Sequence, residues 1–339
     1  MKCYTLHYNW VSFTEITLQN LGINNYLICR LSSSSTFTPM KRFIKLSAFI
    51  LPLLSYSPLT AQVDNMIKQL HQPTQKNVMV AAHRGDWRHA PENSLEAYKL
   101  AIEMGVDILE IDLSKTSDGV IVIMHDQTID RTTNGKGKPS DYTFEELRKF
   151  RLRNGLGRVT RNTIPSFEEV MLLAKGKVLV NLDKSYPYYN EAYQILKKTG
   201  TLEQAIFKSE ASYKEVKQKY PAILDSITFM AVVSLDKPEA RQVIKEYQEK
   251  LKPVAFELNF KSDTSSLLTN NNFINKKGAK IWYNSLWASL NAGHEDDLAF
   301  EDGNTEDSWD WLISHGATVL QTDQPEAMLK YLRKRGLHR

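Results

Sequence analysis

Residues 106–126 read VDILEIDLSKTSDGVIVIMHD. Within this stretch, residues 106–113 and 120–124 are short apolar runs with the length and composition of buried strands. The residues between them, 116–119, read TSDG, which is a turn signal and leaves no room for a helix. We therefore predict two neighbouring strands, of which the second forms a hairpin with the first.

Short apolar runs alternate with helical patterns along the rest of the chain. Further strands are predicted at 78–82, 177–182, 205–207, 226–233, 253–258, 279–283 and 318–321, and helices at 93–104, 143–151, 167–174, 189–198, 213–219, 238–250 and 324–334. This alternation is typical of parallel βαβ units. With the hairpin strand set aside, eight strands remain, so we predict an α/β fold, a (β/α)8 TIM-type barrel with a small hairpin extension after the second strand. The alternative is a doubly wound open sheet, whose usual Gly-rich turn after the first strand is missing from this sequence.

Residues 40–61 differ from the chain that follows them. A cluster of Lys and Arg follows Met40, then comes the apolar run LSAFILPLLSYSPL, and small residues precede Gln62. This is the pattern of a secretory signal, and the alternative is a short buried helix over 46–55. We predict a signal peptide that starts at Met40 and directs the protein to the periplasm or out of the cell. The predicted boundaries are 1–39 for an upstream extension, 40–61 for the signal peptide, 62–77 for a lead-in and 78–339 for a single barrel domain.

Composition excludes several classes of protein. The 339 residues are 42% hydrophobic and 24% charged, which excludes collagen-like and wholly disordered chains. The 43 Lys and Arg residues nearly balance the 39 Asp and Glu residues, so we expect no nucleic-acid partner. No apolar run reaches the roughly 18 residues of a transmembrane helix, so we expect no stable membrane insertion. The two cysteines are too few for a disulfide framework or a zinc site, and the oligomeric state stays open.

Polar side chains follow almost every predicted strand of the barrel. Reactive groups of such barrels lie just past the carboxyl ends of the strands. The residues at these positions here are His83, Glu110, Asp112, His125, Asp183, Lys208, Glu257, Asn284 and Asp323. Their gathering at one end predicts a functional site there.

Three acidic residues at this end predict a cation site. Glu110 and Asp112 are two residues apart on one strand, so their side chains point to the same face. Two carboxylates this close repel each other unless a proton or a cation lies between them. Asp183, after the neighbouring strand, is the natural third ligand, and oxygen ligands suit Mg²⁺ or Ca²⁺ rather than Zn²⁺. We predict one divalent cation here, and the alternative is a surface strand with solvated acids.

Two histidines at the same end predict acid–base chemistry. His83 and His125 each close an apolar strand beside the carboxylates. Imidazole titrates near neutral pH, so one ring is able to remove a proton while the other donates one. The alternative for each is a structural histidine.

Fixed positive charge beside a divalent cation suits a phosphoryl group. Arg84 and Lys184 supply this charge, or else form ion pairs with the acidic residues. Lys208 is a further candidate for phosphate contact, and Trp282 is a candidate for stacking on a ligand, with a core position as its alternative. Asn93 stands three residues before a Glu in a capping-box pattern, so we expect it mainly to start the first barrel helix.

Taken together, these motifs resemble the glycerophosphodiester phosphodiesterase family. The resemblance covers roughly residues 78 to 335. It rests on the stretches His83-Arg84-Gly85, Pro91-Glu92-Asn93-Ser94, Glu110-Ile111-Asp112, Asp118-Gly119, His125-Asp126, 129–137 (IDRTTNGKG) and 164–170 (IPSFEEV).

The resemblance implies a TIM-type barrel, a divalent cation, and hydrolysis of glycerophosphodiesters to an alcohol and glycerol 3-phosphate. It also implies attack by the substrate's own glycerol hydroxyl, with a cyclic phosphate that water then opens. By this resemblance His83 and His125 are the acid–base pair, Glu110 and Asp112 are metal ligands, and Arg84 contacts phosphate.

One departure from the family concerns the third strand. The family usually has Glu-x-Lys there, whereas this chain has Asn181-Leu182-Asp183-Lys184. We carry the metal role to Asp183 and the phosphate role to Lys184, which both reach the site only if the strand has ended or bulged. The alternative functions are a phospholipase-like barrel enzyme that acts on intact lipid head groups, which needs an exposed apolar rim, and a non-catalytic phosphodiester-binding barrel.

Overall fold

A computed structural model describes residues 58–72, 76–269, 271–275 and 277–339, which belong to one compact unit. The predicted upstream extension (1–39) and most of the predicted signal peptide lie outside the described residues. Both therefore stay predictions.

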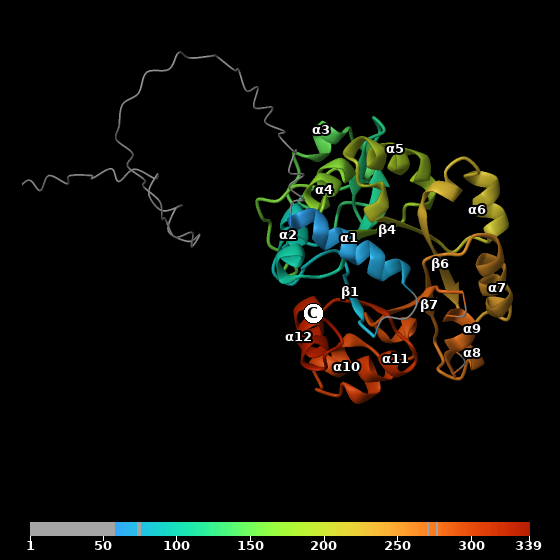
Figure 1. Cartoon of the computed structure of the whole chain (residues 1–339). Coiled ribbons are helices and arrows are strands. Elements are labelled where there is room, and N and C mark those ends of the chain that lie inside the picture. The colour runs from blue at the N-terminus through green and yellow to red at the C-terminus, as the bar shows by residue number, and fades with distance from the viewer. Residues whose placement is uncertain (1–57, 73–75, 270, 276) are drawn as a thin grey trace, which may run out of the picture. The chain divides into compact units, whose positions relative to one another are not determined.

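Eight parallel strands close into a barrel (Figure 1). They are β1 (Met79–Ala82), β2 (Ile108–Lys115), β4 (Leu179–Asp183), β5 (Ala205–Ser209), β6 (Thr228–Ser234), β7 (Ala255–Asn259), β8 (Lys280–Asn284) and β9 (Val319–Thr322). Each strand pairs with the next in chain order, and β1 closes the ring by pairing with both β2 and β9. The short β3 (Ile121–Ile123) runs antiparallel to β2. The predicted barrel with its hairpin extension is thus confirmed.

Helices cover the outside of the barrel. The longer ones lie where the sequence predicts them: α2 (Leu95–Met104), α4 (Phe167–Ala174), α5 (Tyr189–Thr199), α6 (Tyr213–Lys219), α7 (Ala240–Lys250) and α12 (Pro325–Lys334). Shorter ones were not all predicted: α3 (Phe144–Leu147), α8 (Ser266–Thr269), α9 (Asn271–Asn275), α10 (Asp296–Phe300) and α11 (Trp311–Ser314). Helix α3 lies within the predicted helix 143–151, whereas α8 to α11 connect the last strands, where polar and apolar residues do not recur with a clear helical period.

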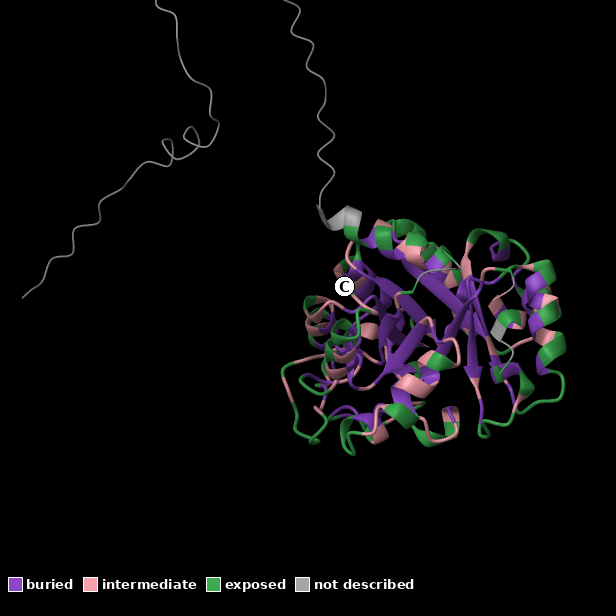
Figure 2. Cartoon of the chain, turned by 60° about the horizontal axis from the view of Figure 1, so that its bottom comes forward, coloured by how far each residue is buried: buried purple, intermediate pink, exposed green. Residues whose placement is uncertain are grey.

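Strand β2 shows how the alternation of side chains builds both the core and the site. Its outward residues Leu109 and Ile111 are fully buried in the large core between strands and helices. Its inward residues are Ile108, Glu110 and Asp112, which are also fully buried. Figure 2 shows the strands as the most continuously buried part of the molecule. Because Ile108 begins the strand, apolar packing fills the end of the barrel where the strands begin, which we call its lower end. The acidic groups lie toward the opposite end, where the strands finish.

A helix not predicted from the sequence closes the lower end of the barrel. Helix α1 (Pro58–His71) packs Val63, Met66 and Leu70 against inward residues near the amino ends of the strands, such as Met79. It takes up most of the predicted lead-in, and its first turn includes the last residues of the predicted signal peptide. This plug leaves the opposite end of the barrel as its open mouth.

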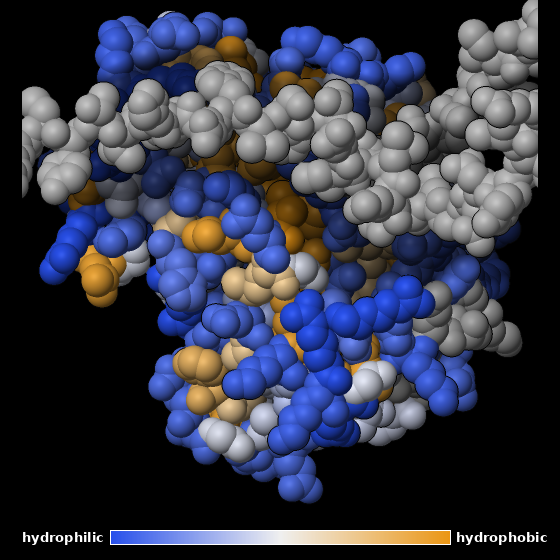
Figure 3. Space-filling model, turned by 60° about the vertical axis from the view of Figure 1, so that its left-hand side comes forward, coloured by the Kyte–Doolittle hydropathy of each residue, from blue (hydrophilic) through white to orange (hydrophobic). Residues whose placement is uncertain are grey.

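Within the described residues, no helix combines the length and apolar character that a bilayer crossing requires. The face in Figure 3 is mainly hydrophilic, with small hydrophobic areas between charged side chains.

The carboxyl-terminal segment is attached to the barrel by a buried ion pair. His338 Nε2 lies 2.9 Å from Asp107 Oδ2, which also accepts a hydrogen bond from the backbone N–H of Val80. Burial by itself lowers the pKa of His338, but the hydrogen bond and charge of Asp107 outweigh it and raise the pKa overall. The imidazolium therefore stabilises the folded state below its ordinary pKa, and this contribution fades as the pH rises through the raised value.

We predict that His338→Gln lowers the free energy of unfolding by about 1 kcal/mol at pH 5.5, because glutamine keeps a hydrogen-bond donor but lacks the charge. As the pH rises through the raised pKa the wild-type imidazole loses its charge, so the difference should be smaller at pH 8.5. Urea unfolding of both proteins at the two pH values checks this, and an equal difference at both would contradict it.

Candidate functional site

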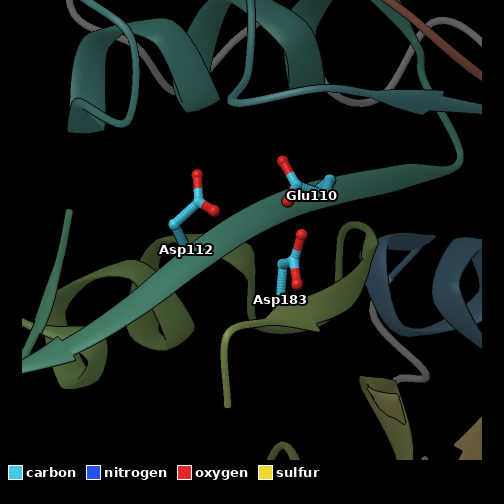
Figure 4. Close-up of side chains that lie close together, drawn as sticks. All are labelled: Glu110, Asp112 and Asp183. Atoms are coloured by element: carbon cyan, nitrogen blue, oxygen red, sulfur yellow. The ribbon is translucent and has the colours of Figure 1, made fainter. Parts of the chain in front are cut away.

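Three carboxylates meet at the open mouth of the barrel (Figure 4). Glu110 and Asp112 rise from the same side of β2, and Asp183 ends the neighbouring strand β4, where it pairs in register with Asp112. Each residue offers one oxygen, and these three oxygens lie within 4.8 Å of one another. Glu110 and Asp112 are fully buried, whereas Asp183 is partly exposed. We call these residues the acidic triad.

The acidic triad fits a hard divalent cation. Glu110 Oε1 and Asp112 Oδ1 are buried, and neither has a hydrogen-bond partner within the described residues. Burial, together with the charge of Asp112, raises the pKa of Glu110 to about 8. Unpartnered buried carboxylate oxygens are costly, and an oxygen-only donor set of this kind suits Mg²⁺ or Ca²⁺.

Asn93 belongs to this site, which corrects the expectation that it mainly starts the first barrel helix. Ser94 caps α2 by accepting a hydrogen bond from the backbone N–H of Ala97. Asn93 instead has a φ of 57° and donates from Nδ2 to Asp112 Oδ2 at 2.9 Å. Its own Oδ1 accepts a bond from the hydroxyl of Tyr98 at 2.6 Å. The capping motif is shifted by one residue, which frees Asn93 to hold an acid of the triad.

His83 is a buried histidine oriented by a carboxylate. Its Nδ1 lies 2.8 Å from Asp323 Oδ1, so that nitrogen carries the proton of this bond and Nε2 stays available. Burial by itself lowers the pKa of His83, but the hydrogen bond that its ring donates to Asp323 and the charge of Glu110 raise it overall. Asp323 follows β9 and also accepts a bond from Trp87 Nε1. Although the sequence placed Asp323 at a strand end, it gave no sign of this partner.

His125 follows the hairpin strand and is oriented in the same way. Its Nδ1 lies 2.6 Å from Asp126 Oδ1. Arg131 bonds to Asp126 and also binds Glu92 through two nitrogens. These bonds lower the pKa of Asp126, the hydrogen bond from Arg131 being the largest cause. His125 is thus fixed by a network of charges, although its side chain is about one-third exposed.

Arg84 contacts three acidic residues at the mouth of the barrel. Its backbone N–H donates to Glu110 Oε2 at 3.0 Å, and its Nη1 donates to Glu92 at 2.9 Å. Its Nε lies 3.6 Å from Asp112 Oδ2, is buried and has no hydrogen-bond partner within the described residues. Arg84 therefore forms the ion pair expected as its alternative role, and still has a free donor.

The two lysines of the prediction lie at the mouth. Strand β4 ends at Asp183, and Lys184 follows it with a φ of 52°. The strand has therefore ended at the point where Asp183 and Lys184 are both able to reach the site. Lys184 Nζ donates to the backbone carbonyl of His125 at 2.7 Å. Lys208 Nζ lies 3.3 Å from Asp183 Oδ2 and 3.0 Å from Glu257 Oε2. Burial opposes the charge of Lys208, but these carboxylates raise its pKa overall.

Trp282 does not reach the mouth. It is fully buried in the inner core below the site, and its Nε1 donates to Asn284 Oδ1. Asn284 in turn donates to Glu257 Oε1, so this tryptophan supports the polar groups from beneath. It therefore takes the core position that was its alternative.

Two neighbouring cavities open at the mouth. The barrel cavity, of about 420 Å³, is lined by residues that include His83, Arg84, His125, Asp183, Lys184, Lys208 and Trp287. The loop cavity, of about 400 Å³, is lined by residues that include His83, Arg84, Trp87, Arg131, Arg153 and Trp287. The two cavities share His83, Arg84 and Trp287, and no member of the acidic triad lines the loop cavity. Six of the predicted site residues thus line one cavity.

We predict that Glu110→Gln lowers the affinity for Mg²⁺ and for Ca²⁺ by more than about tenfold, because it removes a charged ligand oxygen. Isothermal titration calorimetry measures the affinity. The control is Glu191→Gln, a surface glutamate paired with Lys115 away from the triad, which should bind like wild type. Unchanged affinity in Glu110→Gln would exclude this residue as a ligand.

We predict that Asp323→Asn lowers the pKa of His83, because the amide removes both the hydrogen bond to a carboxylate and the negative charge that, together with Glu110, outweigh burial. NMR titration of the His83 ring checks this. Trp87→Phe removes the other hydrogen bond to the same Asp323 oxygen without changing charge, so it should leave the His83 pKa nearly in place. An equal shift in both variants would mean that packing, rather than charge, sets the pKa.

Comparison with known proteins is consistent with this geometry. A family model described as a domain of unknown function matches residues 229–332. A glycerophosphodiester phosphodiesterase from Caldanaerobacter subterraneus is 43% identical over 107 residues, which are 31% of this chain and 44% of that relative. This chain therefore spans less than half the length of that curated relative in the match.

Solved structures cover most of the chain. A glycerophosphoryl diester phosphodiesterase from Parabacteroides distasonis is similar with a TM-score of 0.65 and 25% identity, over 81% of this chain and 92% of that one. A phosphodiesterase from Oleispira antarctica, solved in complex with the product sn-glycerol-3-phosphate, shares the fold with a TM-score of 0.57 and 21% identity, over 75% of this chain and 96% of that one. Curated relatives and solved structures agree, and the predicted resemblance to the glycerophosphodiester phosphodiesterase family is confirmed.

Proposed function

We propose that this protein hydrolyses glycerophosphodiesters to an alcohol and sn-glycerol 3-phosphate with the help of a divalent cation. The observation that carries the proposal is the convergence of two carboxylate-oriented imidazoles, His83 and His125, on the cavity that the acidic triad also reaches. The names of the relatives support it, as does the product bound in the Oleispira antarctica structure.

The acidic triad is the proposed site of Mg²⁺ or Ca²⁺, with Glu110, Asp112 and Asp183 as ligands. Such a cation would polarise a phosphoryl oxygen and offset its negative charge. Arg84 is the proposed phosphate-binding residue, because its buried Nε has no hydrogen-bond partner within the described residues. Lys184 and Lys208 add positive potential to the same cavity, while their direct bonds hold His125 and Asp183 in place.

The two histidines are the proposed proton carriers. In the first step a glycerol hydroxyl of the substrate attacks phosphorus and loses its proton to His125. The bond from phosphorus to the alcohol breaks, and the alcohol oxygen takes a proton from His83, whose raised pKa favours the protonated ring. Water then opens the cyclic phosphate with the two roles reversed. The sum is one diester and one water in, and one alcohol and one glycerol 3-phosphate out.

A second candidate is a phospholipase-like enzyme that acts on intact lipid head groups. It is favoured by apolar side chains exposed at the mouth: Leu156 is 80% exposed between two glycines that line the loop cavity, and Trp287 is 43% exposed. Localisation in the periplasm or outside the cell is likewise a proposal, and it rests on the signal pattern of residues 40–61.

The test is release of glycerol 3-phosphate from glycerophosphodiesters, with and without a chelator. We expect chelation to abolish turnover, and His83→Gln and His125→Gln each to lower kcat by roughly 10²–10⁴, the usual contribution of acid–base catalysis. His71→Gln, on the exposed end of α1 beneath the barrel, is the matched control and should keep the wild-type rate.

Other outcomes separate the alternatives. Turnover that survives the chelator would contradict the role of the cation. Release only from intact lipid in vesicles would favour the phospholipase. Folded, cation-supplied protein that turns over no diester would favour a binding barrel.

A further inference from the structure

We propose that the loop cavity binds the alcohol part of the substrate and prefers an alcohol that carries negative charge. This inference rests on the proposed function. It begins from the division of the mouth into two cavities, of which only the barrel cavity reaches the acidic triad. A diester has two arms, so the arm opposite the cation site lies in the loop cavity. His83 lines both cavities, as the proposed donor to the leaving alcohol must.

Positive charge outweighs negative charge in the lining of the loop cavity. Three guanidinium groups line it, on Arg84, Arg131 and Arg153, against two carboxylates, on Glu92 and Asp323. Both carboxylates are already engaged. Glu92 accepts bonds from two of these arginines, and Asp323 is paired with His83.

Arg153 is the guanidinium that carries the preference. Its Nε donates to the backbone carbonyl of Thr133 and its Nη1 donates to that of Gly157, so the group is held by neutral partners. No carboxylate of the described residues forms an ion pair with it. A charge fixed in this way, and not neutralised, favours an anionic ligand.

The loop that bears Arg153 adds to the positive potential. Residues 151–161 read RLRNGLGRVTR, with four arginines and no acidic residue. The loop folds back on itself through an antiparallel bridge between Arg153 and Val159. Of these four arginines only Arg153 lines the cavity, and the others add positive charge around it.

The loop cavity offers few groups that would bind a cationic alcohol such as choline. Quaternary ammonium groups are usually bound by open aromatic faces. The ring of Trp87 is already covered by the guanidinium of Arg88, 4.4 Å from the ring centre. Trp287 is 43% exposed, and its ring is in T-shaped contact with the ring of His83, with 5.9 Å between the ring centres.

The test compares three diesters that differ in the charge of the alcohol: glycerophosphoinositol 4-phosphate, glycerophosphoinositol and glycerophosphocholine. We expect wild-type kcat/KM to fall in that order, with roughly a tenfold advantage of the phosphorylated over the plain inositol diester, mainly through KM. Arg153→Gln should remove most of that advantage, and Arg153→Lys should keep much of it because the charge remains. The control is Arg161→Gln, an exposed arginine of the same loop outside the cavity lining, which should keep the full advantage.

A binding measurement separates this inference from the proposed function. Calorimetry with inositol 4-phosphate and with inositol, on wild type and Arg153→Gln, needs no turnover. If no diester is turned over but inositol 4-phosphate still binds through Arg153, the proposed function falls and the anionic cavity stands. If diesters are turned over without charge preference, or with choline preferred, the inference falls and the function stands. If Arg153→Gln lowers all three rates equally, the arginine is structural and the inference is overturned.

Discussion

Two carboxylates buried side by side are the constraint around which the mouth of this barrel is arranged. Glu110 and Asp112 are fully buried on one strand, where their like charges repel and their loss of hydration is costly. The strand alternation that buries Leu109 and Ile111 against the helices leaves these acids no other direction. Whatever else lies at the mouth must therefore supply donors or positive charge, and a site built in this way is prepared for a cation.

The donors come from residues in an unfavourable backbone conformation. Arg84, Asn93 and Lys184 have φ values of 56°, 57° and 52°, in the left-handed region that costs a residue other than glycine about 1–3 kcal/mol. Each gives a hydrogen bond to one acid of the triad. The backbone N–H groups of Arg84 and Lys184 donate to Glu110 and Asp183, and the Asn93 amide donates to Asp112. Strain in three loops is thus offset by bonds to three carboxylates, which ties the loop conformations to the site.

Local pattern predicted the strands and the acidic triad, because both depend on alternation within a strand or between neighbouring strands. The plug formed by α1 was missed because its first turn coincides with the end of the predicted signal peptide, which divides the helix between two predicted segments. Asn93 was misjudged because two overlapping capping patterns differ by one residue. The pairing of Asp323 with His83 spans 240 residues and exists only because β9 closes the barrel against β1. Pairings of this kind follow from closure of the barrel and not from sequence spacing.

The residues that line both cavities determine where a diester would place its phosphorus. Among the described residues, only His83, Arg84 and Trp287 line both cavities, so under the proposed function they are the residues placed to contact both arms of such a substrate. Arg84 is held there by Asp112, whose Oδ2 lies 3.6 Å from its Nε, and by Glu92, which accepts a hydrogen bond from its Nη1. A guanidinium that is already held in place loses little conformational freedom when it binds a ligand. This favours a phosphate bound between the two cavities over one bound deeper in either of them. The buried negative charge of Asp112, which is costly to desolvate on folding, therefore also positions the Arg84 guanidinium that would bind the phosphate.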